Sequence, residues 1–298
     1  MKKDLKFAGY LLLYKKIEGS IMLREMITEI NTYISDMDKF YIFNFCKEDQ
    51  FPLIEELQKK YGEIEYAKLI TLGQAADYKR VLEHAKGGDF DYVTILEKGY
   101  FYEDEAYHEI KKRLILGEIE EDYSVITPTP IYTCEDKSDK NEESRTIRGS
   151  HLTGTFINLH IYKESNGIDE SYYRTTFDYD YCLQTRKKGY KVLLFNNLVL
   201  RNKNFIRLQK NILWHTFYAY HRDIYDVYYE TRGRLYLWEK YKSFDPEYVK
   251  IDKKQQNLEF KEMKLFEKKF RMIKEIINEA RIDYRENKTG KTYNEISY

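Results

Sequence analysis

Buried-strand and amphipathic-helix patterns alternate through the first hundred residues. Residues 7–14 read FAGYLLLY, a continuous apolar run typical of a strand covered on both faces. Over residues 21–34 the apolar positions recur at helical spacing. The same alternation predicts strands at 40–45, 68–71 and 91–96, with helices at 52–61 and 74–85. Strands joined by single helices indicate a parallel, doubly wound sheet, which binds ligands at the carboxyl ends of its strands.

The second half of the chain predicts a mixed pattern that ends in helices. The elements expected there are a helix at 103–116, a strand at 123–132, a polar loop at 135–144, ordered structure at 150–161, a helix at 178–188, a strand at 190–200 and helices at 214–241 and 253–282. We therefore expect an α/β domain over residues 1–205 and a helical C-terminal extension over 206–298.

Charge and composition narrow the classes of function. Lys and Arg total 50 and Asp and Glu total 50, so the net charge is +0, which argues against nucleic acid as the main partner. The three cysteines form no C-x-x-C pair, which favours a reducing interior over a disulfide framework or zinc site. No run approaches the ~18 apolar residues that span a bilayer, so we expect a cytoplasmic protein. The basic and apolar residues of 253–282 leave two interpretations open: a solvated or oligomer-forming face, or peripheral contact with the inner face of the cell membrane.

Two carboxylates open the helix expected at 178–188. Asp178 and Asp180 lie where unpaired backbone N–H groups and the positive end of the helix dipole favour ionised side chains. An ionised Asp above the ends of a parallel sheet can act as a general base toward an acceptor hydroxyl. Asp at a helix start also serves as a simple cap, so the local chemistry alone leaves both interpretations open.

The order and spacing of motifs around these carboxylates resemble family 2 glycosyltransferases of the GT-A fold, in particular the bacterial rhamnosyltransferase-like branch. The matching segments are Gly167-Ile168-Asp169-Glu170, Tyr172, Asp178-Tyr179-Asp180-Tyr181-Cys182 and Gly189-Tyr190-Lys191, with Gln184 in place of the usual Arg. Weaker matches are Leu152-Thr153-Gly154-Thr155-Phe156, Tyr228-Tyr229-Glu230-Thr231-Arg232-Gly233 and the basic segment 280–291. The resemblance implies a Rossmann-like, mainly parallel sheet, with a donor half over 1–100 and an acceptor half over 101–205.

The resemblance assigns the donor site to the carboxyl ends of the first four strands, where this chain departs from the family. Tyr14, Asn44, Gly73, Glu97 and Lys98 would border the nucleotide sugar, but the metal-binding D-x-D motif reads Glu97-Lys98-Gly99. Glu97 would be the metal ligand if Mg²⁺ or Mn²⁺ is used at all. A His expected after the strand at 190–200 is replaced by Arg201-Asn202. Basic side chains at Lys98, Arg201 or Lys203 would then neutralise the leaving diphosphate in a metal-independent enzyme.

The resemblance therefore implies an inverting glycosyltransferase of bacterial surface polysaccharide synthesis, with a nucleotide-diphosphate donor and a glycan or lipid-linked saccharide acceptor. Asp178 would be the catalytic base, Asp180 would support the site, and Thr153 and Gly154 would shape the acceptor floor. The alternative is a catalytically silent subunit that acts as a binding or scaffold partner of another transferase. Many of the 30 tyrosines flank the expected acceptor region, where aromatic faces suit sugar rings.

Overall fold

The computed structural model describes residues 3–132, 142–204, 206–212 and 215–292. Its strands within these ranges are β1 Phe7–Leu13, β2 Lys39–Asn44, β3 Glu65–Lys68, β4 Tyr92–Glu97, β5 Tyr100–Tyr102, β6 Tyr123–Tyr132, β7 Ser144–Ile147, β8 Phe156–Asn158, β9 Lys191–Asn202, β10 Arg207–Ile212 and β11 His215–Tyr220. The α-helices are α1 Gly19–Ile30, α2 Phe51–Tyr61, α3 Gln74–Lys86, α4 Ala106–Leu116, α5 Leu159–Glu164, α6 Phe177–Lys187, α7 Ile224–Tyr241, α8 Pro246–Phe266 and α9 Phe270–Arg285.

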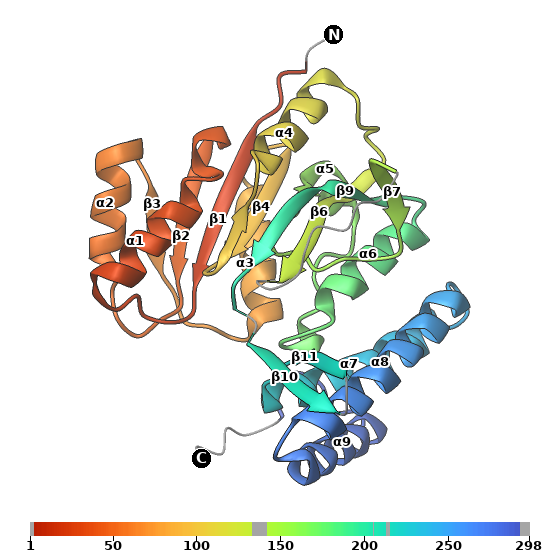
Figure 1. The fold of residues 1–298 in the computed structure, drawn as a ribbon. Coiled ribbons are helices and arrows are strands. Elements are labelled where there is room, and N and C mark those ends of the chain that lie inside the picture. Colours follow the sequence, from red (N-terminus) through yellow and green to blue (C-terminus); the bar gives the residue numbers. More distant parts are fainter. Residues whose placement is uncertain (1–2, 133–141, 205, 213–214, 293–298) are drawn as a thin grey trace.

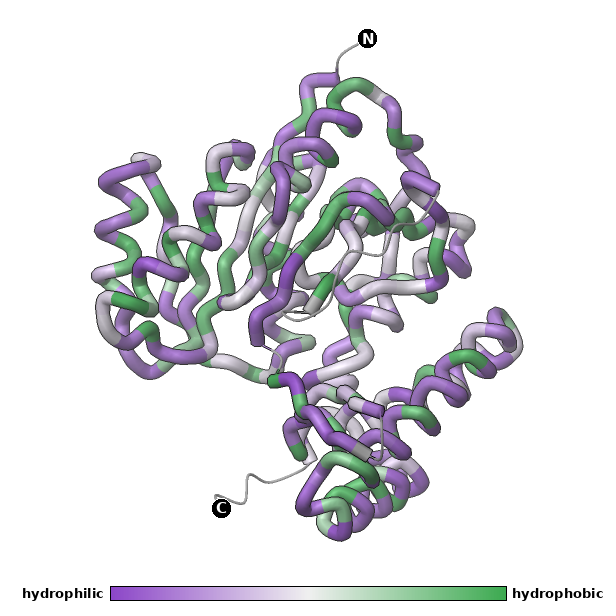
Figure 2. Tube along the Cα trace, in the orientation of Figure 1, coloured by the Kyte–Doolittle hydropathy of each residue, from purple (hydrophilic) through white to green (hydrophobic). Residues whose placement is uncertain are grey.

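One mixed sheet organises the first two hundred residues, in the order β3-β2-β1-β4-β8-β6-β9-β5, with β7 paired to β9. The pairs β3–β2, β2–β1, β1–β4 and β6–β9 are parallel, whereas β8 runs antiparallel to both β4 and β6. The buried, apolar β1 lies at the centre of the parallel part, as its continuous hydrophobic run predicts. In Figure 2 the hydrophobic segments gather along these central strands, while the outer helices carry many hydrophilic positions.

Two hydrophobic cores cover the faces of the sheet. One holds side chains of α1, α2 and α4, such as Met26, Leu53 and Ile110. The other holds side chains of α3, α5 and α6, together with Leu237 and Tyr241 of α7. Because the second core includes residues from the C-terminal region, that region is packed onto the sheet domain.

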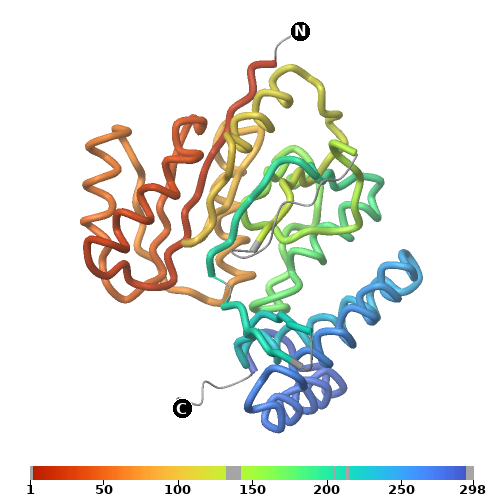
Figure 3. Tube along the Cα trace, in the orientation of Figure 1, coloured from red at the N-terminus to blue at the C-terminus, as the bar shows by residue number. Residues whose placement is uncertain are grey.

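The C-terminal region begins with the antiparallel hairpin β10–β11 and continues as α7, α8 and α9. Figures 1 and 3 show it below the sheet, at the edge where β1 and β4 end. None of the helices in the described ranges is both long and apolar enough to cross a bilayer.

The structure confirms the expected fold class and corrects several elements. The single helix expected at 214–241 is wrong: the described part of that segment is strand β11, a three-residue connection and α7, which begins after Asp223 caps its first turn through Tyr225 N–H at 2.8 Å. The single helix expected at 253–282 is two helices, because the chain turns between Phe266 and Phe270. The strand expected at 68–71 is β3, three residues earlier. Most of the polar loop expected at 135–144 lies outside the described residues.

Candidate functional site

An aspartate and a histidine form the most distinctive polar pair at the expected acceptor side. Asp178 lies in the first turn of α6, and its Oδ2 accepts a hydrogen bond from His151 Nδ1 at 2.5 Å. The Asp178 side chain is 9% exposed, whereas the His151 side chain is 66% exposed. The ring of Tyr179 meets the His151 ring edge-on, with centroids 5.3 Å apart. A buried carboxylate therefore orients an accessible imidazole.

The backbone around Asp178 is held by a close approach of two helices. Thr176, which precedes α6, adopts the left-handed conformation with φ +68°. Gly233 of α7 lies directly against it, since a Cβ on Gly233 would come within 2.0 Å of Thr176 Oγ1. Only glycine allows this approach, so the C-terminal region sets the position of the helix that carries Asp178.

Asp180 faces a different set of partners from Asp178. Its Oδ1 accepts hydrogen bonds from Tyr241 at 2.9 Å and Tyr172 at 3.2 Å, and pairs with Lys240 Nζ at 2.7 Å. Burial raises the pKa of the Asp180 carboxyl, although Lys240 and Tyr241 oppose the shift. Asp180 also lines a cavity of about 790 Å³ together with Asp169 and Lys240. Asp180 therefore links α6 to α7, and its role as a residue that supports the site remains a prediction.

Hydrogen bonds connect the acceptor side to the carboxyl end of β4. Glu97 Oε1 accepts from Gln74 Nε2 at 2.9 Å and from the Tyr78 hydroxyl at 3.0 Å. The same Tyr78 hydroxyl lies 2.6 Å from Thr153 Oγ1. Burial raises the pKa of Glu97 above its usual range, while the bonds from Gln74 and Tyr78 oppose that shift. The hydroxyl of the buried Tyr78 is thus hydrogen-bonded to both Thr153 and Glu97.

Thr153 and Gly154 pack beside the end of β4. Thr153 forms a parallel bridge with Ile95, and Gly154 N–H donates to the Ile95 carbonyl at 2.7 Å. The Tyr102 hydroxyl donates to the Gly154 carbonyl at 2.9 Å. These contacts fix Thr153 and Gly154 at the sheet. They therefore also place His151, which lies two residues before Thr153, at this edge.

The residues expected at the ends of β1 and of the third strand lie at the same edge. Tyr14 stacks on Phe45 with ring centroids 5.3 Å apart. Burial raises its pKa, and the charges of Glu97 and Asp77 raise it further. Gly73 has φ +113° and precedes α3, where a Cβ would meet the Tyr173 ring at 2.5 Å.

Asn44, which was expected to bind the donor, uses its side-chain amide in hydrogen bonds within the protein. It is completely buried, and its Nδ2 donates to the Glu48 carbonyl at 2.7 Å and to Tyr66 Oη at 2.9 Å. Its Oδ1 accepts from Cys46 N–H at 2.9 Å. Because both amide hydrogens are used, Asn44 shapes the loop after β2, and nucleoside binding by its side chain remains a prediction.

The basic residues considered for diphosphate neutralisation differ in their partners. Arg201 pairs with Glu103, and Lys203 Nζ lies 3.3 Å from Glu29 Oε1. For Lys98 Nζ, no carboxylate lies within ion-pair distance in the parts of the chain that the structure describes. Arg174, which pairs with Asp226 of α7 at 2.5 Å, also acts electrostatically on Glu97 and Tyr14. Among Lys98, Arg201 and Lys203, Lys98 is therefore the residue whose charge is available to a ligand.

The residues at the end of β4 do not fit a divalent-metal site. In the described ranges, no three His, Cys, Asp or Glu side chains come together in a group that could hold a metal ion. Glu97 is a single carboxylate, its protonated form is favoured by burial, and Lys98 follows it directly. Oxygen-rich sites for Mg²⁺ or Mn²⁺ need several such ligands.

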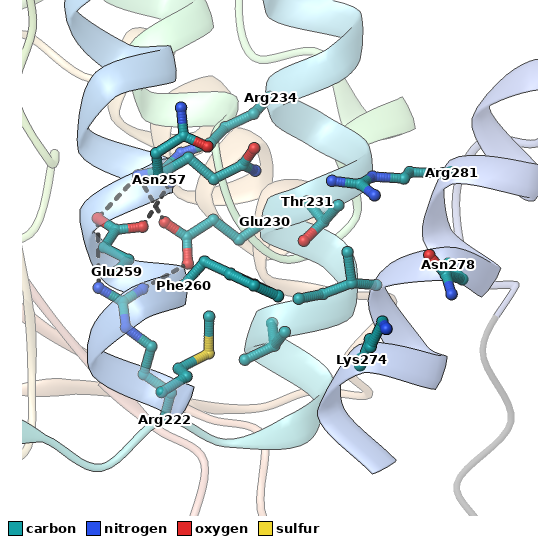
Figure 4. A pocket seen from close by; sticks show the side chains of 14 residues that line it. Arg222, Glu230, Thr231, Arg234, Asn257, Glu259, Phe260, Lys274, Asn278 and Arg281 are labelled. Carbon is teal, nitrogen blue, oxygen red and sulfur yellow. Dashed lines mark hydrogen bonds and ion pairs between the residues drawn. The ribbon is translucent and has the colours of Figure 1, made fainter. Parts of the chain in front are cut away.

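A buried ion network lies between α7 and α8, beside a cavity of about 240 Å³ that α9 closes (Figure 4). Arg234 donates to Glu259 through two contacts, at 2.5 and 3.2 Å, and lies 2.9 Å from Glu230. Arg222 pairs with the same two carboxylates at 3.0 and 3.3 Å, so both lie between two guanidinium groups. Glu230 and Arg234 also act electrostatically on His151. The network therefore extends the charged surroundings of the Asp178–His151 pair.

Several residues of the site carried little signal in the sequence. Tyr78 lies in the middle of α3, where its position reads only as part of an apolar helical face. Arg174 was the one basic residue between the acidic pair at 169–170 and Asp178, but nothing indicated that it pairs across to Asp226. The pairing of His151 with Asp178 gave no local signal, because the two residues lie 27 positions apart in the sequence.

Comparison with known proteins finds similarity in structure alone. GalNAc-T7, solved with UDP, GalNAc and Mn²⁺, matches with a TM-score of 0.54 at 9% identity, over 67% of this chain and 44% of that chain. S. aureus TarS 1-349 matches with a TM-score of 0.47 at 10% identity, over 67% of this chain and 60% of that chain. No family model and no curated protein matches. The chain spans under half of the GalNAc-T7 structure and about three fifths of the TarS structure. Together with the sheet order, the first similarity shows that the chain has a GT-A glycosyltransferase fold with a C-terminal helical region.

Proposed function

We propose that this protein is an inverting glycosyltransferase, similar to family 2 and its rhamnosyltransferase-like branch, that uses a nucleotide-diphosphate sugar. The acceptor would be a hydroxyl of a glycan or lipid-linked saccharide in bacterial surface polysaccharide synthesis, on the cytoplasmic side. GalNAc-T7 and TarS, which share features of the fold, were solved with UDP or UDP-GlcNAc. The observation that carries the proposal is the Asp178–His151 pair beside Thr153, which is linked through Tyr78 to Glu97 at the donor edge.

The proposed reaction is a single displacement. A proton acceptor in the Asp178–His151 pair takes the proton of the acceptor hydroxyl, whose oxygen attacks the anomeric carbon. The bond from that carbon to the diphosphate breaks, and Lys98 offsets the charge that develops on the leaving group. Because the β4 end does not fit a divalent metal, the proposal has no step that depends on one.

Calorimetric titration with UDP-glucose, UDP-GlcNAc and dTDP-rhamnose, with Mn²⁺ and with EDTA, tests donor binding. We expect at least one donor to bind equally well under both conditions. The variant Lys98→Met should weaken that binding about tenfold, which corresponds to about 1.4 kcal/mol. Lys261→Met, an exposed position on α8, is the matched control and should bind as the wild type does. Absence of binding for every donor under both conditions would exclude the proposed enzyme.

Two observations favour a second candidate, a non-catalytic partner of another transferase. The amide of Asn44 is consumed within its own loop, and Glu97 is the single carboxylate where the family carries two. Loss of nucleotide binding would leave the fold and the C-terminal helices as an interaction surface. The same titration separates the candidates, since a silent subunit would bind none of the three donors.

A further inference from the structure

We propose that His151 Nε2 is the general base of the proposed transfer and that Asp178 is a positioning residue that acts through it. This assignment rests on the proposed function and changes which atom receives the proton. The resemblance to known transferases pointed to the aspartate as the base. The geometry points instead to the histidine in front of it.

Accessibility separates the two residues. Asp178 Oδ2 is engaged by His151 Nδ1 at 2.5 Å, and Asp178 Oδ1 accepts from Tyr179 N–H at 2.9 Å. With a side chain that is only 9% exposed, the carboxylate is covered by its own partners. The His151 ring, at 66% exposure, is the part of the pair that an acceptor hydroxyl can reach. A general base must lie within hydrogen-bond reach of the proton that it removes.

The hydrogen bond also decides which nitrogen is basic. An ionised carboxylate only accepts hydrogen bonds, so the bond to Asp178 requires a proton on His151 Nδ1. In the neutral ring, Nε2 then carries the free lone pair. Within the described residues, Nε2 has no hydrogen-bond partner of its own. The edge-on ring of Tyr179 limits rotation of the imidazole, so this nitrogen keeps its direction.

The charges around His151 suit a base. Desolvation lowers the pKa of His151, the charge and the hydrogen bond of Asp178 raise it, and the net result is a pKa above the usual value. From α7, Glu230 raises it further and Arg234 lowers it. A raised pKa strengthens the base.

The proton balance of the step is complete with these groups. The acceptor O–H bond breaks and its proton passes to Nε2, while the oxygen forms the new bond to the anomeric carbon. The bond from that carbon to the diphosphate breaks with its electron pair. The imidazolium is stabilised by Asp178 through Nδ1–H, and it returns its proton to solvent after product leaves. His151 lies two residues before Thr153, which is at most about 7 Å of chain, and Thr153 is joined to the donor edge through Tyr78.

The test compares His151→Ala, Asp178→Asn and a control, His160→Ala, in release of nucleoside diphosphate from the tightest-binding donor. The control removes a similar pair, since His160 is also 66% exposed and lies 2.8 Å from Asp91 on another part of the surface. We expect His151→Ala to lower kcat by about 10²–10⁴ and added imidazole to restore part of it. His160→Ala should not change kcat, and imidazole should have no effect on Asp178→Asn.

A second measurement follows the His151 ring by NMR against pH. In Asp178→Asn the pKa of His151 should fall by about one unit or more, because the carboxylate that favours the imidazolium is gone. The neutral wild-type ring should carry its proton on Nδ1. If the wild type releases nucleoside diphosphate and His151→Ala keeps its kcat, this assignment fails and the proposed function stands. If the wild type neither binds nor cleaves any donor, both fail.

Discussion

The close approach of Gly233 to Thr176 offers the sharpest test of how the C-terminal region supports the site. In Gly233→Ala the new Cβ would lie 2.0 Å from Thr176 Oγ1, 3.1 Å from its Cβ and 3.3 Å from its Cγ2. Rotation of the threonine cannot relieve all three contacts. Overpacking of this kind costs about 3 kcal/mol at the upper end, and the better helix propensity of Ala returns about 1 kcal/mol. We therefore expect a net loss of about 2 kcal/mol.

For a chain of this length, such a loss lowers Tm by roughly 4 °C, which circular dichroism melting will resolve. Gly87→Ala is the control, because that position has φ −74° and the nearest atom to a new Cβ is 3.4 Å away. Thr176→Gly removes the clashing atoms and also the strain of a β-branched residue at φ +68°. The double variant should then melt about 2 °C above Thr176→Gly alone, because only the gain in helix propensity remains. Equal melting of Gly233→Ala and Gly87→Ala would refute the packing argument.

Three further predictions concern buried charges and a thiol. Arg234→Met should lower the free energy of unfolding by about 3–5 kcal/mol, because it leaves the buried Glu259 and the partly buried Glu230 beside one remaining arginine. Arg271→Met, at a side chain that is 95% exposed, should melt like the wild type. Burial raises the pKa of Glu97, so above the ordinary Glu pKa of ~4.3 the folded state binds more protons than the unfolded chain, and the free energy of unfolding falls as the pH rises. The Tm of Glu97→Gln should therefore gain on that of the wild type as the pH is raised above this value, and a constant difference would contradict this. Burial raises the pKa of the Cys182 thiol to about 12, so iodoacetamide at pH ~8 should label it only after unfolding, as mass spectrometry will show.

The sequence predicted the sheet well because its central strands are buried on both faces. β1, β2 and β4 each read as apolar runs, and these runs specify both the strand and its parallel neighbours. β3 was misplaced because its four residues, EYAK, have no apolar run and none is fully buried. β11 was missed because its aromatic residues are mostly exposed. Their positions in the sequence therefore do not show the alternation of buried and exposed residues that indicates a strand.

The break between α8 and α9 shows a different limit. The apolar positions continue at helical spacing from Leu258 to Ile277 without Pro or Gly, so periodicity predicts one helix. In the folded chain Met263 and Ile277 belong to one hydrophobic cluster with Val227 of α7, which requires the chain to turn back. Glu267, at the turn, accepts a hydrogen bond from His221 Nδ1 at 2.9 Å. The break is thus fixed by tertiary contacts that local pattern cannot report.

The candidate site was predicted in its acidic part and missed in its connections. Asp178 was visible as a carboxylate at a helix start, because that signal is local. Its pairing with His151, and the Tyr78 bridge between Thr153 and Glu97, join residues 19 to 75 positions apart. Such pairs depend on how the strands are ordered, which the sequence gives only coarsely.

The last described residues return to the middle of the chain. Gly290 N–H donates to the Ser171 carbonyl at 2.8 Å, and Arg232, which is 1% exposed, donates to the Gly290 carbonyl at 2.6 Å. During synthesis, the acidic segment around Asp169 leaves the ribosome more than a hundred residues before these partners exist. The sheet can form early, but the cavity lined by Asp169, Asp180 and Lys240 reaches its final shape only when residues near 290 have been made. A protein arrested before that point would have the fold without the finished site.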